Sequence, residues 1–193
     1  MVGLAACVSF GPSTPSTHYE LQAAFDGQPV TGPGPALVVA PPTAAPGFDG
    51  TRIVYVKMPH RLEFFSRSEW VDTPARMLAP LLVRALERSG GFASVAEASS
   101  AAVARLRVET EVVRLQHEFL QRPSRVRLTI RVQLSEVPSR YVLGAREFEA
   151  VEEAPSDNPY GGVVAANRAV RRVLDDIVAY CRDRSVERAA SPR

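Results

Sequence analysis

The chain has 193 residues, of which 46% are hydrophobic, so it can form one domain with a substantial core and flanking tails. Its 23 basic and 21 acidic residues leave a net charge of +2, which gives no electrostatic reason to expect a nucleic-acid partner. The cysteines Cys7 and Cys181 lie at opposite ends of the chain and lack the clustered spacing of a zinc or redox site. No metal or cofactor is therefore expected, and no apolar run is long enough to span a membrane.

Residues 1–7 have the form of the end of a bacterial lipoprotein signal peptide. Leu4, two alanines and Cys7 make a lipobox, in which small residues fit a peptidase groove and the thiol accepts a diacylglycerol. The basic and apolar regions of a full secretory signal are missing, so we interpret these residues as a truncated signal. Acylation contributes roughly 0.8 kcal/mol per buried CH₂, so two or three chains on Cys7 would anchor the protein stably.

The segment from residue 8 to residue 35 is rich in Ser, Thr, Pro and Gly, with a short apolar island around Leu21. This composition buries little apolar surface, which predicts a flexible tether. We expect the folded domain over residues 36–183 and a disordered polar tail over residues 184–193.

The first elements of the domain follow in a simple order. Ala36–Ala40 is a short apolar run and predicts a strand. Arg52–Met58 and Arg61–Ser66 are rich in β-branched and aromatic residues and predict a hairpin. Thr73 and the proline after it form a helix start, and apolar residues at helical spacing follow from Met77 onward.

The second half of the domain predicts a further hairpin and a long helix. Alternation over Leu106–Val112 slips by one residue afterwards, which predicts a β-bulge. Val126–Leu134 alternates without interruption, and Tyr141–Phe148 should return as another strand. Asn158 and the next proline start a helix whose apolar face extends to Cys181, expected as a small buried hydrophobe. The predicted fold class is α+β, a mostly antiparallel sheet of about five strands with two main helices on one face.

Aromatic residues gather around the first hairpin. An alternating hairpin exposes part of such a group, and surface Trp and Tyr often mark an interface. Packing beneath the first helix is an equally good interpretation. The candidate partner-interface residues are Tyr55, Phe64, Phe65 and Trp70.

An enzymatic function finds little support, because no histidine lies in a Ser, Cys or acidic motif with catalytic spacing. His117 beside Glu118 is interpreted as a surface pair at a strand end. The acidic stretch Glu147–Glu153 is interpreted as a solvated strand end, since no Ca²⁺-binding loop surrounds it. Gly161 and Gly162 near a helix start lack the flanking pattern of a phosphate-binding loop.

Taken in order, short motifs along the chain resemble the ABC-type transport auxiliary lipoprotein components, a family that includes the paraquat-inducible protein C group. Each motif is degenerate, and their order and spacing carry the resemblance from Cys7 to about Tyr180. They are the lipobox, His18-Tyr19-Glu20-Leu21, Ile53-Val54-Tyr55, Leu62-Glu63-Phe64-Phe65, Trp70 followed by Pro74, Met77 and Leu78, and Ala104-Arg105-Leu106.

The resemblance implies a non-enzymatic periplasmic domain, similar in fold to the TolB amino-terminal domain and held on the outer membrane by Cys7. Val8 follows the cysteine, in place of the Asp that commonly retains lipoproteins on the inner membrane. The implied partner is a mammalian-cell-entry (MCE) domain protein of an ABC system that moves lipids, with a homo-oligomer as an expected state. The alternative is an envelope-tethered scaffold or binding module unrelated to lipid transport.

Overall fold

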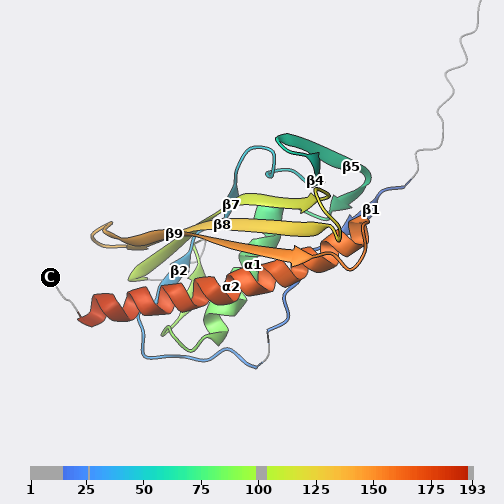
Figure 1. Ribbon diagram of the computed structural model, residues 1–193. Helices are drawn as coiled ribbons and strands as arrows, with labels where there is room; N and C mark the ends of the chain where they lie inside the picture. The colour runs from blue at the N-terminus through green and yellow to red at the C-terminus, as the bar shows by residue number, and fades with distance from the viewer. Residues whose placement is uncertain (1–14, 26, 99–103, 191–193) are drawn as a thin grey trace, which may run out of the picture.

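A large mixed sheet and two helices form the structure, a computed structural model that describes residues 15–25, 27–98 and 104–190 (Figure 1). The predicted α+β class is confirmed. The described residues form nine strands rather than about five, and several pairings are parallel. The elements in chain order are β1 (Thr17–Tyr19), β2 (Leu37–Val39), β3 (Thr43–Ala44), β4 (Arg52–Met58), β5 (Arg61–Trp70), α1 (Pro74–Arg88), β6 (Val95–Glu97), β7 (Leu106–Glu118), β8 (Arg125–Glu136), β9 (Val142–Glu153) and α2 (Pro159–Ala190).

Strand β7 is the centre of the sheet. One of its edges pairs antiparallel with β8, which pairs antiparallel with β9. Its other edge pairs in parallel with β2, β3 and β4 at successive positions, and β4 continues the sheet through β5 to β1. The predicted bulge is confirmed by a register shift between Val112 and Arg114. The strand predicted from the apolar run Ala36–Ala40 is confirmed as β2. Strands β1 and β3, which were not predicted, have three and two residues, too few for alternation to reveal them.

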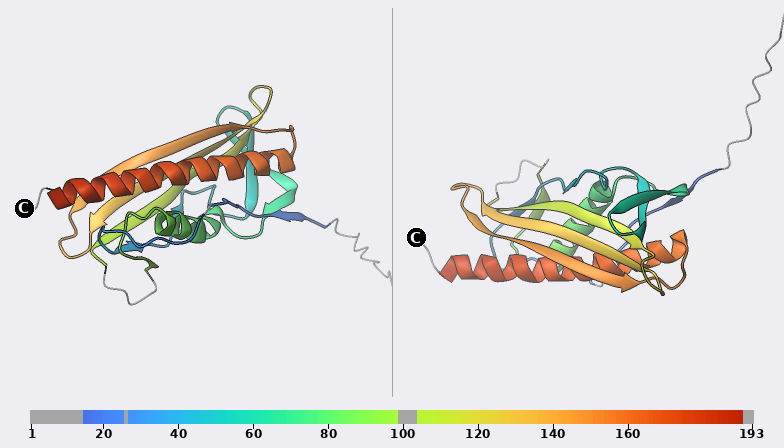
Figure 2. Two further views of the ribbon diagram at one scale, coloured as in Figure 1. Left: turned by 90° about the horizontal axis from the view of Figure 1, so that it is seen from below. Right: turned by 45° about the horizontal axis from the view of Figure 1, so that its top comes forward.

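Both helices cover the same face of the sheet, as Figure 2 shows. Helix α1 begins where the Thr73 side chain accepts a hydrogen bond from the Arg76 amide, with Pro74 in the first turn. Helix α2 begins where the Asn158 Oδ1 accepts a 2.8 Å hydrogen bond from the Gly161 amide. Helix α2 packs along β8 and β9, and α1 packs beside it, so the aliphatic core lies between the helices and the sheet.

Part of the segment predicted to be a flexible tether belongs to the fold. Thr17–Tyr19 forms β1, which pairs in parallel with β5. Leu21 is buried, and its amide lies 3.5 Å from the sulfur of Met77 on α1. The Val30 amide donates to the Glu87 carbonyl at the end of the same helix. The prediction of a flexible tether is corrected for this part of the segment, because the apolar island around Leu21 fills space beside α1 that the surrounding Pro and Gly residues could not fill.

The predicted disordered tail also differs from the structure. Helix α2 continues to Ala190, because the guanidinium of Arg188 donates to Glu136 of β8 at 2.7 Å and Ser185 is buried. The end of the molecule formed by the β8–β9 turn and the last turns of α2 is called the far end below. The near end is the opposite one, where β1 leads into the sheet and α2 begins (Figure 1).

Candidate functional site

Two of the predicted interface residues form an aromatic cluster at the near end. The rings of Tyr55 and Phe65 lie 4.5 Å apart on neighbouring strands. Phe119 stands edge-on to both, at 6.1 Å and 6.3 Å, and its ring lies 4.2 Å from that of His117. The pairing of β4 with β7 brings these rings together, since Tyr55 lies opposite His117. We call Tyr55, Phe65, His117 and Phe119 the aromatic cluster; all except His117 are partly exposed.

The other two predicted residues lie elsewhere. Phe64 is adjacent to Phe65 and therefore points to the opposite face of the strand, where the Arg52 guanidinium lies 3.8 Å above its ring. Trp70 is only 4% exposed and packs in the core. The prediction of an interface role for Trp70 is corrected, because a side chain buried to this degree offers no surface to a partner.

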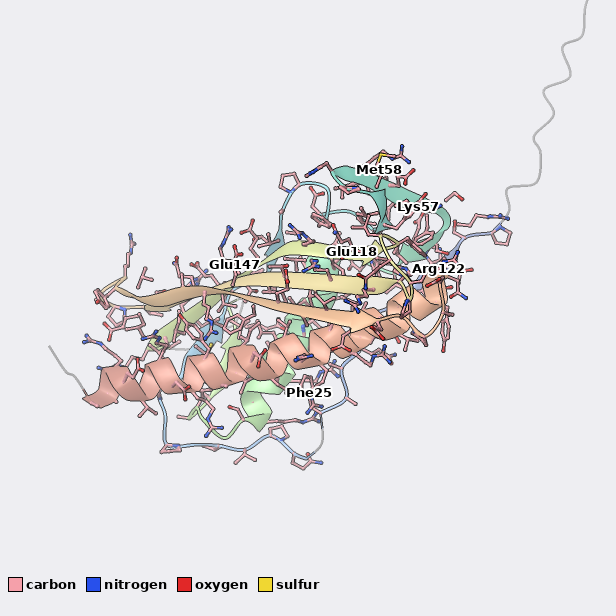
Figure 3. The ribbon with its side chains drawn as sticks, in the orientation of Figure 1. Phe25, Lys57, Met58, Glu118, Arg122 and Glu147 are labelled. Atoms are coloured by element: carbon pink, nitrogen blue, oxygen red, sulfur yellow. The ribbon has the colours of Figure 1, made fainter. Side chains whose placement is uncertain are left out.

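Exposed side chains lie on the chain segments that carry the aromatic cluster. Met58 and Leu120 are 54% and 49% exposed, and Leu120 directly follows Phe119. The ammonium of Lys57 lies 5.0 Å from the centre of the Tyr55 ring. Arg122 follows in the same loop as Leu120, with its side chain 94% exposed. Figure 3 labels Lys57 and Met58 at the β4–β5 hairpin and Arg122 beside the start of α2. With Leu120 they form what we call the rim.

His117 is buried, which corrects its interpretation as a surface residue. It is 2% exposed, and its Nε2 lies 2.8 Å from the hydroxyl of Ser124. The Ser124 amide in turn donates a 2.9 Å hydrogen bond to Asp157. Burial lowers the pKa of His117 from 6.5 to about 4, and the negative charge of Asp157 opposes this only in part. The histidine is therefore neutral over the ordinary pH range.

These three residues do not form a catalytic triad. Asp157 contacts Ser124, whereas a triad requires the carboxylate to orient the histidine. The Nδ1 of His117 has no hydrogen-bond partner among the described residues, and Ser124 is fully buried. A substrate could not reach this hydroxyl without unfolding the strand end, so the cluster is a structural link between β7, β8 and the loop before α2.

The two glycines at the start of α2 have a packing role. A side chain at Gly162 would place its Cβ 2.5 Å from the Nδ1 of His117, and one at Gly161 would meet the carbonyl of Ser156. Asn158 already accepts from the Gly161 amide at this helix start. These contacts explain the glycine pair by close approach of the chain.

Glu147 and Glu149 of β9 are held in ion pairs on the helix-free face of the sheet, whereas Glu152 pairs with Arg168 and Arg172 of α2. Arg131 bridges Glu111 and Glu147, with both distances at 2.7 Å. Arg127 bridges Glu118 and Glu149 in the same way, at 2.8 Å and 2.6 Å. The part of the chain that the structure describes contains no cluster of three or more His, Cys, Asp or Glu arranged for a metal ion.

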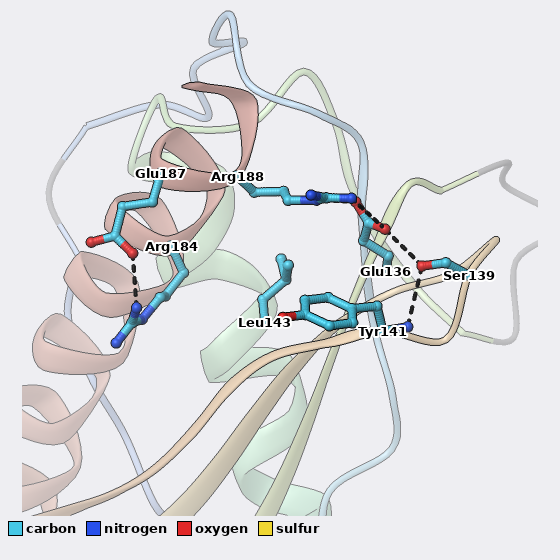
Figure 4. Close-up of a pocket in the computed structure, with 7 residues that line it drawn as sticks. All are labelled: Glu136, Ser139, Tyr141, Leu143, Arg184, Glu187 and Arg188. Carbon is cyan, nitrogen blue, oxygen red and sulfur yellow. Dashed lines mark hydrogen bonds and ion pairs between the residues drawn. The ribbon is translucent and has the colours of Figure 1, made fainter. Parts of the chain in front are cut away.

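An open groove of about 500 Å³ lies at the far end, between the β8–β9 turn and α2 (Figure 4). Glu136 lines it and accepts hydrogen bonds from Arg188 at 2.7 Å and from Ser139 at 2.6 Å. These bonds, that of Arg188 foremost, lower the pKa of Glu136 to about 2. Tyr141 and Leu143 supply the apolar part of the groove. No local sequence pattern reveals this groove, because its two sides are far apart in the chain.

These features define a two-layer α+β module whose candidate sites are surfaces at its two ends. The chain belongs to the family of ABC-type transport auxiliary lipoprotein components, whose model matches residues 19–178. No curated protein matches the chain at a significant level. The family consists of auxiliary components, and neither it nor the similar structures indicate a catalytic family.

Solved structures share the fold. A Xanthomonas campestris protein of the DUF330 family has a TM-score of 0.80 and 21% identity, with 91% of this chain and 100% of that chain covered. A hypothetical protein from Chlamydia trachomatis has a TM-score of 0.58 and 12% identity, with 82% and 99% covered. At these identities the similarity concerns the fold alone.

Membership in a lipoprotein family associates the chain with the cell envelope. Within the described residues, no helix has the length and apolar character required to cross a bilayer. Cys7, the predicted lipidation site, lies outside the described residues.

Proposed function

We propose that this protein is a lipid-anchored accessory of an ABC-type envelope lipid-transport system, tethered to the outer membrane through Cys7 with its domain in the periplasm. The observation that carries the proposal is the family match over residues 19–178, which spans nearly all of the described fold. The lipobox-like sequence ending at Cys7 precedes the matched region and supplies the residue that an anchor requires.

In this role the domain is a non-enzymatic docking component for the MCE-domain protein of the same system. ATP hydrolysis would be carried out by the cognate ATPase, so the accessory needs surfaces and no reactive groups. The buried His117 and the ion-paired acids of β9 are consistent with this role, because they stabilise the domain and offer no reactive group to a substrate. Tyr55, Phe64 and Phe65 are the residues that we propose to contact another component of the envelope.

The anchor is tested by Cys7→Ala in protein expressed with a complete signal peptide. We expect native protein in the outer-membrane fraction and the variant in the soluble periplasm. A Cys181→Ala variant is the matched control, since that thiol is buried and lies outside the lipobox sequence. Equal membrane association of native protein and Cys7→Ala would refute lipidation at Cys7.

Docking is tested by co-isolation of the anchored protein with the MCE-domain protein encoded beside it. Capture at a fixed ratio supports the proposal, and sedimentation of the Cys7→Ala protein measures whether the domain self-associates into a homo-oligomer. The second candidate is an envelope-tethered scaffold without a lipid-transport role. A membrane-anchored protein that captures no MCE component, from a genome with no neighbouring ABC permease genes, would favour that candidate.

A further inference from the structure

The near end carries apolar side chains that the fold does not cover. Met58 and Leu120 are 54% and 49% exposed beside the partly exposed rings of the aromatic cluster. Their chain segments lie side by side, because the Phe119 amide donates a 2.8 Å hydrogen bond to the Val56 carbonyl. Exposed apolar groups gathered on neighbouring segments mark a surface that contacts something less polar than water. Lone exposed apolar residues would need no such explanation.

The same rim is basic. Lys57, the only lysine of the chain, stands at the Tyr55 ring. The Arg122 side chain is 94% exposed and lies 4.0 Å from Asp157, and a pair so exposed contributes little, so its charge is available to a partner. Apolar side chains flanked by Lys and Arg match an interface of lipid phosphates and the upper part of the acyl chains.

The path of the chain places this surface near the anchor. The described chain begins at residue 15 and enters strand β1, which pairs in parallel with β5, at the near end (Figure 1). From Cys7 to Thr17 the chain can span at most about 35 Å when fully extended. The near end therefore stays close to the membrane in any orientation of the domain. The far end lies about 48 Å away along the 32-residue α2 and can turn away from it.

We infer that the rim and the exposed side of the aromatic cluster rest on the phospholipid headgroup surface of the membrane that holds Cys7. The inference rests on the proposed anchoring and names the partner of this surface. The contact is weak alone, because few side chains take part. The tether makes it an intramolecular event at high effective concentration, which lets a weak contact set the orientation of the domain. The far-end groove then faces away from the bilayer.

The test labels the intact, lipidated protein in vesicles of phosphatidylethanolamine and phosphatidylglycerol. Met58→Cys and Val142→Cys are each coupled to an environment-sensitive fluorophore; Val142 is 44% exposed at the far end and is the matched control. Cys181 is buried and does not compete for the label. Nitroxide-labelled lipid should quench the probe at position 58 at least about fivefold more than the probe at position 142. Equal quenching at both positions would overturn the inference.

A second arm separates this contact from lipidation. Full-length Cys7→Ala protein is floated with the same vesicles at low salt, alone and with the additional changes Met58→Asn and Leu120→Asn. We expect weak binding that these two changes reduce about tenfold and that high salt also reduces. If Cys7→Ala binds vesicles in this way, the contact stands even where lipidation fails. If both probes stay unquenched and the two changes instead abolish capture of the MCE-domain protein, the occupant is a protein and the inference is wrong.

Discussion

Acid should destabilise this domain through His117, and His117→Gln should remove that sensitivity. The ring is buried beside Gly162 and Phe119, and only its Nε2 has a partner, the Ser124 hydroxyl. The imidazolium carries a proton on both ring nitrogens, and Nδ1 has no acceptor among the described residues. Gln keeps a terminal amide that can donate to the same hydroxyl, and it does not titrate.

The size of the effect follows from the pKa of His117, which burial lowers from 6.5 to about 4. The unfolded chain therefore binds more protons than the folded one between these values, so stability is full above pH 6.5 and is lost as the pH falls toward 4. At 1.36 kcal/mol per pKa unit, the complete loss is roughly 3 kcal/mol. Between pH 7 and pH 4.5 the expected loss is about 2 kcal/mol.

The measurement is urea unfolding at pH 7, 6, 5 and 4.5, followed by fluorescence of Trp70, the only tryptophan and a buried one. Asp157, whose pKa is lowered chiefly by the Ser124 hydrogen bonds, also loses stabilisation in acid. The quantity of interest is therefore the difference between native protein and His117→Gln at each pH. This difference should shrink by about 2 kcal/mol from pH 7 to 4.5. Parallel curves for the two proteins would refute the reasoning.

Three further outcomes are expected. Gly162→Ala should lower the free energy of unfolding by about 1–3 kcal/mol, because its Cβ would lie 2.5 Å from His117, and unchanged urea unfolding would contradict this. Burial raises the pKa of the Cys181 thiol to about 12, so in Cys7→Ala protein at pH 8 a disulfide reagent should modify it only after denaturation; rapid reaction of the folded variant would exclude the buried position. Glu136→Gln should speed amide exchange in the last turn of α2 by weakening its bond to Arg188, whereas unchanged exchange would show that packing alone holds this turn.

Much of the fold could be predicted from local patterns. The strands with clear alternation, the bulge after Val112 and the two capped helix starts were all visible as short-range signals. Strands β1 and β3 could not be predicted in this way, because they have three and two residues and depend on partners distant in the chain. The packing of β1, Leu21 and Val30 against the domain is missed for the same reason, since the composition of this segment predicts a tether while its contacts are to distant residues.

The position of His117 in the aromatic cluster could have been predicted from the sequence, because the predicted bulge in β7 already determines which way its side chain faces. The predicted bulge changes which residues of β7 face the helices, so Leu115 and the alternate residues after it point inward. His117 stands between Leu115 and Phe119 in that alternation, and the bulge alone places it on the core side. The pairing of β7 with β4 then brings Tyr55 against it, a contact between distant segments that no local pattern contains. The aromatic cluster thus follows from one local irregularity, readable in the sequence, and one long-range pairing that only the fold supplies.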